Sequence, residues 1–295
     1  MEMYKTKAFA KINITLDVIN KRCDGYHDLE MIMQTISLND EVTVKRNSSG
    51  DIRLFSKGVN IPRDNKNLAW RAAEAVKKAY KISDGVDIEI QKKIPVAAGL
   101  AGGSSDCAAV IRGMREIFMP NKPISDFYSI ASSLGKDVPF CIEGGTVFAF
   151  GLGDQFKKLK DIPHFYVAVA KPNIYVSTAE VYKALKIEDI KKHPNTKAVI
   201  DCIDAGDKNG IISGVLNVLE NVTANKYPVI ETIKNLMLKN GALSSAMSGS
   251  GPSVFGLFNN REGAEKAVCG VREILGIKEV FLAETLSPQA FREEF

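Results

Sequence analysis

A segment of small residues after an apolar strand is the part of this chain best suited to chemistry. It runs Pro95-Val96-Ala97-Ala98-Gly99-Leu100-Ala101-Gly102-Gly103-Ser104-Ser105-Asp106, between the alternating stretch Val86–Ile90 and the helix-forming stretch Cys107–Ile111. Glycines let backbone N–H groups approach a phosphate closely, and a helix N-terminus carries partial positive charge. Ser104 and Ser105 add hydroxyls that can bond phosphate oxygens or reach a metal ion. The segment predicts a phosphate-binding loop, with a glycine turn that only caps a helix as the alternative.

This loop differs from the two common nucleotide-binding signatures. The pattern G-x-x-x-x-G-K-[ST] requires a lysine that is absent, and G-x-G-x-x-G fails because position 101 is alanine. A second glycine-rich segment, Met247–Gly256, leads into a strand and so lacks a helix dipole. Tight packing between elements and contact with a ligand both explain it. Neither segment contains G-x-S-x-G, which argues against a Ser-His-Asp hydrolase.

Two charged residues are suited to phosphoryl transfer, which needs charge stabilisation and a positioned base. Lys11 stands between Ala10 and Ile12 at the head of an apolar strand, and Asp137 follows a predicted helix end at Gly135. The plainer interpretations are a lysine whose charged head reaches solvent at a sheet edge and an aspartate that caps the next turn. The H-R-D and D-F-G signatures of protein kinases are absent.

Alternating strand-like and helix-like segments predict that a mixed α/β fold positions these residues. Expected strands cover Ile12–Ile19, Glu41–Val44, Val86–Ile90 and Val254–Phe258, and expected helices cover Asn67–Tyr80, Ser125–Leu134, Tyr227–Lys239 and Glu262–Leu275. Ser125 is expected to cap its helix, and Gly135 to follow that helix as the C′ residue. Asp24-Gly25 indicates a loop rather than a tight hairpin, because its flanks are charged.

Composition narrows the class of protein. With 45% hydrophobic and 25% charged residues, the chain resembles an ordinary globular protein, and its 295 residues suggest two domains or one large one, with any boundary near Lys157–Pro163. No apolar run reaches membrane-spanning length, and no secretory signal is visible at the N-terminus. Five scattered cysteines indicate reduced thiols in a cytoplasmic protein, and the three dispersed histidines argue against a structural zinc site.

The positive charge is local. A formal net charge of +4 is too small to indicate a nucleic-acid binder. Between Phe156 and Ile200, nine lysines accompany four acidic residues, so this stretch carries +5 and the rest of the chain −1. A solvated lysine-rich face is the plainer interpretation. A surface that meets a phosphorylated small molecule is the sharper one, because positive potential steers anions.

Four blocks of the sequence together resemble the GHMP kinase superfamily. They are Ala10-Lys11-Ile12-Asn13-Ile14-Thr15-Leu16 running on to Asp24-Gly25-Tyr26-His27, the loop Pro95–Asp106, Gly135-Lys136-Asp137-Val138-Pro139-Phe140, and Ser248-Gly249-Ser250-Gly251-Pro252-Ser253. The resemblance spans most of the chain. Its most specific element is Asp-Gly-Tyr-His, which is similar to the superfamily's kinases for a cytidine-diphosphate-linked methylerythritol and is absent from its other kinases.

The resemblance implies a role for each matching position. Asp137 would be the general base for the attacking hydroxyl, and Lys11 would hold that hydroxyl and favour the ionised carboxylate. The ATP phosphates would lie against Pro95–Ser105, with Asn67 on the adenine side and Mg²⁺ bridging phosphate oxygens. Asn13, Tyr26 and His27 would recognise the cytidine, with Tyr182 closing the other face of the base and Tyr175 as the competing candidate. No carboxylate is implied as the Mg²⁺ ligand.

The implied fold has two domains. An N-terminal α/β domain, residues 1–160, would contain a left-handed βαβ element, and residues 161–295 would form a ferredoxin-like α+β domain. The implied activity is ATP-dependent phosphorylation of the substrate's 2-hydroxyl to the 2-phosphate, with release of ADP, in non-mevalonate isoprenoid biosynthesis. A kinase for a mevalonate-like or homoserine-like substrate is one alternative. A catalytically silent nucleotide or metabolite sensor is another, although retention of Lys11 and Asp137 speaks against it. The sequence predicts no oligomeric state.

Overall fold

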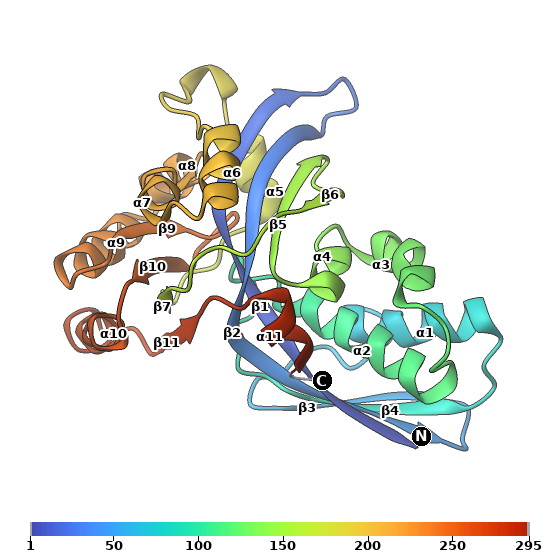
Figure 1. Cartoon of the computed structure of the whole chain (residues 1–295). Coiled ribbons are helices and arrows are strands. Elements are labelled where there is room, and N and C mark those ends of the chain that lie inside the picture. Colours follow the sequence, from blue (N-terminus) through green and yellow to red (C-terminus); the bar gives the residue numbers. More distant parts are fainter. Residues whose placement is uncertain (1, 294–295) are drawn as a thin grey trace.

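The computed structural model describes residues 2–293, which form two β-sheets with helices packed against each (Figure 1). The strands are β1 Met3–Lys21, β2 His27–Asn47, β3 Ile52–Lys57, β4 Gly85–Gln91, β5 Thr146–Gly151, β6 Gln155–Lys158, β7 Tyr166–Lys171, β8 Leu216–Asn217, β9 Ser244–Met247, β10 Val254–Phe258 and β11 Glu279–Glu284. The helices are α1 Leu68–Tyr80, α2 Gly102–Phe118, α3 Tyr128–Leu134, α4 Val138–Glu143, α5 Thr178–Ala184, α6 Thr196–Ala205, α7 Lys208–Ser213, α8 Glu220–Lys226, α9 Val229–Lys239, α10 Arg261–Leu275 and α11 Pro288–Glu293. Two 3₁₀ turns, η1 Ile124–Phe127 and η2 Ile187–Asp189, complete the described chain.

Two long antiparallel strands, β1 and β2, organise the larger sheet. Its order is β3-β4-β2-β1-β8, with β5 also pairing with β2 and with β6. Strand β1 is buried on both faces in its middle: Ala8, Leu16 and Val18 pack in one hydrophobic cluster, whereas Ile12 and Ile14 pack in another. Because both faces of β1 are buried in its middle, the strand need not alternate in polarity, and it runs from Met3 to Lys21 rather than over the alternating stretch Ile12–Ile19 alone.

The strand–helix–strand unit β3–α1–β4 carries the chain to the first glycine-rich loop. Strands β3 and β4 are parallel neighbours joined by α1. Asn67 is the N-cap of α1, and its Oδ1 accepts a hydrogen bond from Ala69 N at 2.9 Å. The loop after β4 then leads into α2, which packs against α1 and against β1 and β2. This is the strand–loop–helix order that the sequence predicts.

The smaller sheet has the order β11-β7-β10-β9, with every neighbouring pair antiparallel. Helices separate β7 from β9 and β10 from β11, and α9 and α10 pack on the sheet. This arrangement is the βαββαβ pattern of a ferredoxin-like α+β unit, so the expected two-part fold is confirmed. Residues 159–165 join β6 of the larger sheet to β7 of the smaller one.

The later part of the chain returns to the larger sheet. Strand β8 pairs in parallel with β1, and an isolated bridge joins Ile36 to Thr285. Because the two parts of the sequence are interleaved in this way, the boundary between residues 160 and 161 stays a prediction.

One local expectation is wrong: Ser125 lies inside the 3₁₀ turn η1 rather than at a helix N-cap, because Asp126 N bonds the carbonyl of Pro123 and the α-helix begins only at Tyr128. Gly135 directly follows α3 after Leu134, as expected, and takes the C-cap position with an extended φ of 179°. Asp24-Gly25 lies in a loop of residues 22–26 rather than in a tight two-residue turn, as expected, and this loop joins the antiparallel strands β1 and β2; a hydrogen bond from Arg22 N to Tyr26 O at 2.8 Å closes it. Arg22 also pairs with Asp24 and Asp28, so the charged flanks stabilise the turn.

The remaining features are simple. All five cysteines are free thiols. Within residues 2–293, no helix combines the length and the apolar character that crossing a membrane requires.

Candidate active site

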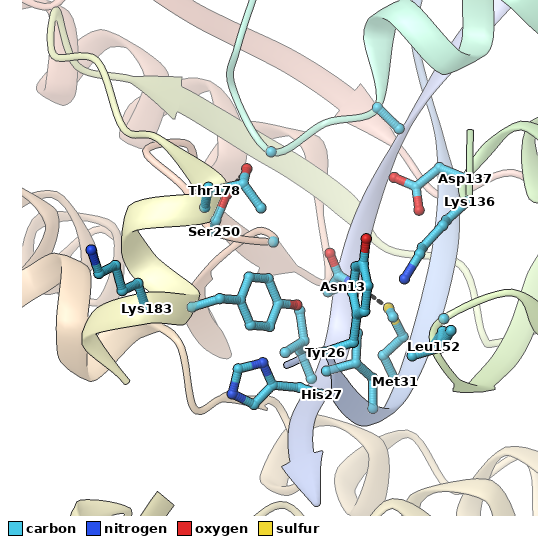
Figure 2. Close-up of a pocket in the computed structure, with 18 of the residues that line it drawn as sticks. Asn13, Tyr26, His27, Met31, Lys136, Asp137, Leu152, Thr178, Lys183 and Ser250 are labelled. Atoms are coloured by element: carbon cyan, nitrogen blue, oxygen red, sulfur yellow. Dashed lines mark hydrogen bonds between the residues drawn. The ribbon is translucent and has the colours of Figure 1, made fainter. Parts of the chain in front are cut away.

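A pocket of about 620 Å³ lies where the two glycine-rich segments meet β1, the β1–β2 turn and α5 (Figure 2). Eight residues singled out in the sequence contribute to its wall: Lys11, Asn13, Tyr26, His27, Gly99, Ala101, Asp137 and Tyr182. These residues are spread between positions 11 and 182 of the chain, and the fold brings them together.

Lys11 and Asn13 lie on one face of β1 between two register shifts of the strand. The shifts fall at Phe9/Lys11 and at Asn13/Thr15, and such irregularities often re-aim side chains beside active sites. Lys11 Nζ donates to Asn13 Oδ1 at 2.6 Å, and Asn13 Nδ2 contacts the sulfur of Met31 at 3.3 Å. Lys11 is only 4% exposed, so it does not reach solvent at a sheet edge. Burial lowers the pKa of Lys11, and the negative charge of Asp137 opposes that shift.

The carboxylate of Asp137 is available to a ligand. Asp137 occupies the N-cap position of α4, but its side chain makes no capping hydrogen bond. Figure 2 shows the carboxylate of Asp137 and the ammonium of Lys136 turned toward the pocket, with His27 on the opposite side. In the described part of the chain, this carboxylate has neither a hydrogen bond nor an ion pair with another side chain. The interpretation of Asp137 as a capping residue is therefore wrong.

The opposite side of the pocket is aromatic. The rings of His27 and Tyr182 have centroids 5.5 Å apart and planes inclined by 32°. Burial lowers the pKa of His27, with a further contribution from Lys21, so the imidazole is neutral at neutral pH. Tyr26 is 59% exposed, and Lys136 Nζ lies 5.2 Å from the centre of its ring. Tyr175 is 73% exposed and lies outside the pocket wall, so Tyr182 is the tyrosine that the fold brings to this site.

The two glycine-rich segments pack against each other at the pocket wall. Ser248 Oγ donates to Gly99 O at 2.9 Å, and Gly99 has a φ of +76°. A Cβ at Gly99 would lie 2.1 Å from the carbonyl oxygen of Ser248, so only glycine fits. A Cβ at Gly249 would come 3.6 Å from Lys11 Nζ. The second segment packs against the first loop, and its Gly249 and Ser250 line the pocket, so its contact with a ligand stays a prediction.

The start of α2 is open to an anion. Its N-cap, Ala101, has no side chain that could bond the first N–H groups of the helix. Gly103 is exposed, and a Cβ there would meet no atom within 4 Å. Ser105, in contrast, is buried and donates its hydroxyl to the carbonyl of Phe9 at 2.7 Å. The hydroxyl of Ser105 therefore points into the protein, and Ser104 is the serine nearer the surface.

Asn67 and most of the loop residues predicted to contact ATP do not line this pocket. Asn67 lies outside the pocket wall, and its amide is used at the start of α1, accepting from Ala69 N and donating to Pro62 O at 2.8 Å. In the loop, Pro95, Ala98 and Leu100 are buried, whereas Val96 and Ala97 are exposed. The contributions of these residues to a nucleotide site stay predictions.

Sequence reasoning missed several residues of the pocket wall. Lys136, Thr178 and Lys183 all line it, and Thr178 shares a hydrogen bond of 2.8 Å with Ser250 of the second glycine-rich segment. Lys136 directly precedes Asp137, and that adjacency was the available signal. Asn217, which is 3% exposed, donates to the carbonyls of Met247 and Gly249 at 2.8 and 2.7 Å and so fixes the second glycine segment. No local pattern marks that role.

Comparison with known proteins identifies relatives of the whole chain. A profile described as GHMP kinases N terminal domain matches residues 67–145, and one described as GHMP kinases C terminal matches residues 190–276. The chain is 45% identical to the 4-diphosphocytidyl-2-C-methyl-D-erythritol kinase of Caldicellulosiruptor saccharolyticus, over 98% of this chain and 99% of that protein. The protein of the same name from Clostridioides difficile is 44% identical over 93% of this chain and 92% of its own length.

Solved structures of related kinases superpose on nearly the whole chain. A crystal structure of 4-(cytidine 5'-diphospho)-2C-methyl-D-erythritol kinase superposes with a TM-score of 0.82 at 31% identity, covering 96% of this chain and 99% of that one. The mevalonate kinase of L. major in complex with R-mevalonate superposes with a TM-score of 0.74 at 16% identity, covering 96% of each chain. At that identity the second likeness concerns the fold alone.

Proposed function

Because this chain belongs to the family of 4-diphosphocytidyl-2-C-methyl-D-erythritol kinases, we propose that its pocket transfers a phosphoryl group from ATP to the 2-hydroxyl of 4-diphosphocytidyl-2-C-methyl-D-erythritol. The products are the 2-phosphate and ADP, in the non-mevalonate supply of isoprenoid precursors. The observation that carries the proposal is the pocket itself, which has a buried lysine and an unpaired carboxylate near the glycine-rich loops and an aromatic pair opposite them.

Asp137 is the proposed general base. The bond from the substrate oxygen to the γ-phosphorus forms, the bond from that phosphorus to the ADP oxygen breaks, and the proton of the hydroxyl passes to the Asp137 carboxylate. Lys11 supplies positive charge beside the reacting oxygen, and its contact with Asn13 Oδ1 fixes where the ammonium lies. Burial lowers the pKa of Lys11, and the opposing effect of the Asp137 charge on that pKa supports this pairing.

The aromatic side of the pocket is the proposed cytidine site. A base stacked on a protein ring is worth about 1–3 kcal/mol, and this interaction can anchor the end of the substrate that does not react. Tyr182 and His27 provide two rings within reach of each other, and a neutral imidazole at His27 can exchange hydrogen bonds with an uncharged base. Tyr26 and Asn13 complete the proposed set.

The loop Pro95–Ser105 and the start of α2 are the proposed site of the ATP phosphates. The uncapped N–H groups at the start of α2 support this placement, as does the close approach that Gly99 permits. Asn67 is carried forward as an adenine-side residue. The side-chain amide of Asn67 already donates to Pro62 O and accepts from Ala69 N. Asn67 would therefore contribute to adenine binding by holding the backbone of residues 62–69 in place.

Mg²⁺ is the proposed metal of the reaction. In the part of the chain that the structure describes, no cluster of three His, Cys, Asp or Glu side chains forms a metal cage. This fits an ion that is bound mostly by nucleotide phosphates and water, with one or two carboxylates. When bound, Mg²⁺ would neutralise charge on the phosphates of ATP.

Substitution of Asp137 tests the proposed base. Loss of a general base costs about 10²–10⁴-fold in rate, so Asp137→Asn should lower kcat by that factor while ATP still binds. Asp126→Asn is the matched control, because Asp126 is a surface carboxylate paired with Lys122 outside the pocket. Near-normal turnover by Asp137→Asn would rule out its assignment as the base.

Competition and alternative acceptors test the substrate. Cytidine 5′-diphosphate should compete with the cytidylyl substrate, and neither homoserine nor mevalonate should be phosphorylated. Phosphorylation of homoserine or mevalonate would show that the protein has the activity of another kinase of the superfamily. The proposal also includes a cytoplasmic location, a small-molecule partner rather than nucleic acid, and domains divided at residues 160 and 161.

A further inference from the structure

Beneath the first glycine-rich loop, three ionisable side chains meet in the protein interior. Lys92 Nζ contacts Asp106 Oδ2 at 2.8 Å and also binds Asp40 Oδ2. The side chains of Lys92, Asp40 and Asp106 are 3%, 0% and 4% exposed. Asp40 comes from β2, Lys92 directly follows β4, and Asp106 lies near the start of α2. None of them lines the pocket.

This cluster contacts the chain on both sides of the loop. Asp40 Oδ1 accepts hydrogen bonds from the backbone N–H groups of Lys93 and Ile94, at 2.5 and 2.8 Å, directly before the loop begins at Pro95. Asp106 belongs to α2, where the loop ends. A Cβ on Gly102 would come within 3.4 Å of Lys92 Nζ. One buried ammonium group therefore joins the entrance of the loop to its exit.

The backbone of the loop needs such support. Ala97 and Ala101 have φ values of 52° and 58°, in the left-handed region that alanine disfavours. Conformations of this kind persist where the surrounding structure holds them. A buried ionic cluster contributes little more to stability than apolar side chains of the same volume, but its contacts are directional. The cluster is therefore better explained by the geometry it imposes than by the stability it adds.

The charges of the cluster are close to balance at neutral pH. Burial raises the pKa of Asp106 to about 8, with Lys92 opposing the shift and Asp40 adding to it. Asp106 Oδ1 is buried without a hydrogen-bond partner. An asparagine at this position would therefore resemble the native carboxyl in shape and charge, and it would still offer Lys92 an acceptor.

We propose that Lys92 is a positioning residue for phosphoryl transfer: by binding Asp40 and Asp106 together, it sets the separation of the two ends of the loop Pro95–Ser105 and so the geometry with which that loop holds ATP. The inference rests on the proposed function, because it takes this loop as the ATP site. Lys92 acts through the loop backbone and touches neither substrate.

Three variants at position 106 separate this role from a general role in folding. Asp106→Ala removes the acceptor of Lys92, Asp106→Leu replaces it by apolar volume, and Asp106→Asn keeps an acceptor. In all three, the Lys92–Asp40 pair stays balanced in charge. Calorimetry on the full chain would measure the Kd of ATP and, as a probe of the opposite side of the pocket, the Kd of cytidine 5′-diphosphate.

Asp106→Ala and Asp106→Leu should weaken ATP binding by about 10- to 100-fold, as displaced supporting groups commonly do. Asp106→Asn should stay within about threefold of the parent, and cytidine 5′-diphosphate binding should stay within about twofold in all variants. Parental ATP affinity in folded Asp106→Leu would overturn the inference. So would equal loss of both ligands in all three variants, because that pattern indicates general structural damage.

A second design covers a failure of the single variants to fold. The triple variant Asp40→Asn, Lys92→Met, Asp106→Leu leaves no buried charge unpaired and keeps an acceptor for the N–H groups of Lys93 and Ile94. It should fold and bind ATP weakly, and tight ATP binding would refute the role of Lys92. If the parent itself bound no ATP, the proposed function would fail. If the parent bound and used ATP while these variants did so equally well, only this inference would fail.

Discussion

Gly99→Ala tests how closely the two glycine-rich segments must approach for the pocket to work. Gly99 has a φ of +76°, and a Cβ on it would lie 2.1 Å from the carbonyl oxygen of Ser248. Ordinary van der Waals contact begins at 3.4 Å, so the two segments would have to move about 1.3 Å apart. Ser248 Oγ also bonds Gly99 O, and that contact would be strained by the same movement.

The expected loss follows from this displacement. A misplacement of roughly 1 Å at a positioning element can cost about 10²-fold in rate, equivalent to about 2.7 kcal/mol of transition-state stabilisation. Gly99 belongs to the proposed phosphate loop and lines the pocket where that loop meets the second glycine-rich segment, so kcat/KM for ATP should fall by about that factor. A coupled assay of ADP release at varied ATP would measure it, with circular dichroism to establish that the variant is folded.

Gly276→Ala is the matched control. Gly276 has a φ of +65° at the end of α10, and a Cβ there would meet no atom within 4 Å. Alanine at this position therefore incurs the same type of backbone cost, about 1–2 kcal/mol, with no overlap and no contact with the pocket. Its kcat/KM should match that of the parent. If Gly99→Ala kept kcat/KM within about threefold of the parent, the close approach of the two segments would not be needed for activity.

Three further predictions follow from the pocket and the buried cluster. Tyr182→Ala should raise KM for the cytidylyl substrate about 5- to 150-fold with little change in kcat, because stacking on a base is worth about 1–3 kcal/mol; a fall confined to kcat at saturating substrate would contradict this. Burial lowers the pKa of Lys11, and the charge of Asp137 opposes that shift. As pH rises, Lys11 should therefore lose its proton, and kcat/KM should decline, at a lower pH than that at which an exposed lysine titrates. In Asp137→Asn the decline should move to still lower pH, and an unmoved limb would count against the coupling. The pKa of Asp106 is raised to about 8, so the native state holds this proton more tightly than the unfolded state, and the free energy of unfolding should fall as pH rises from about 4 to 8. Urea titrations should show that fall reduced in Asp106→Asn, and identical profiles for the two proteins would contradict it.

Much of the fold follows from local patterns in the sequence. The N-cap at Asn67, the apolar spacing through Tyr80 and the strand near Val86–Ile90 lead directly to the first glycine-rich loop and to α2. These features depend on residues close together in the chain, so periodicity and capping chemistry are enough to predict them. The failure at Ser125 was equally local: Pro123 takes the N-cap position of a 3₁₀ turn that contains Ser125.

The site was predicted only in part, because its parts meet through tertiary structure. The blocks that contain Lys11, Tyr26 and Asp137 were found by their resemblance to a family, whereas spacing alone left each of them open to a structural interpretation. Lys92 escaped notice because its partners lie 52 and 14 positions away, and a lysine after a strand looks solvated. Lys136 escaped for a similar reason, although its ammonium lies over the ring of Tyr26. Pairings between distant segments carry no periodic signal.

The most direct test of the central claim is to incubate the protein with ATP, Mg²⁺ and 4-diphosphocytidyl-2-C-methyl-D-erythritol and to follow the phosphorus NMR spectrum. We expect one new phosphomonoester on the 2-oxygen for each ADP released, with the diphosphate link to cytidine intact. The Asp137→Asn variant should form that product about 10²–10⁴-fold more slowly. Failure of the parent protein to form the 2-phosphate, or transfer from ATP to homoserine or mevalonate in its place, would contradict the claim.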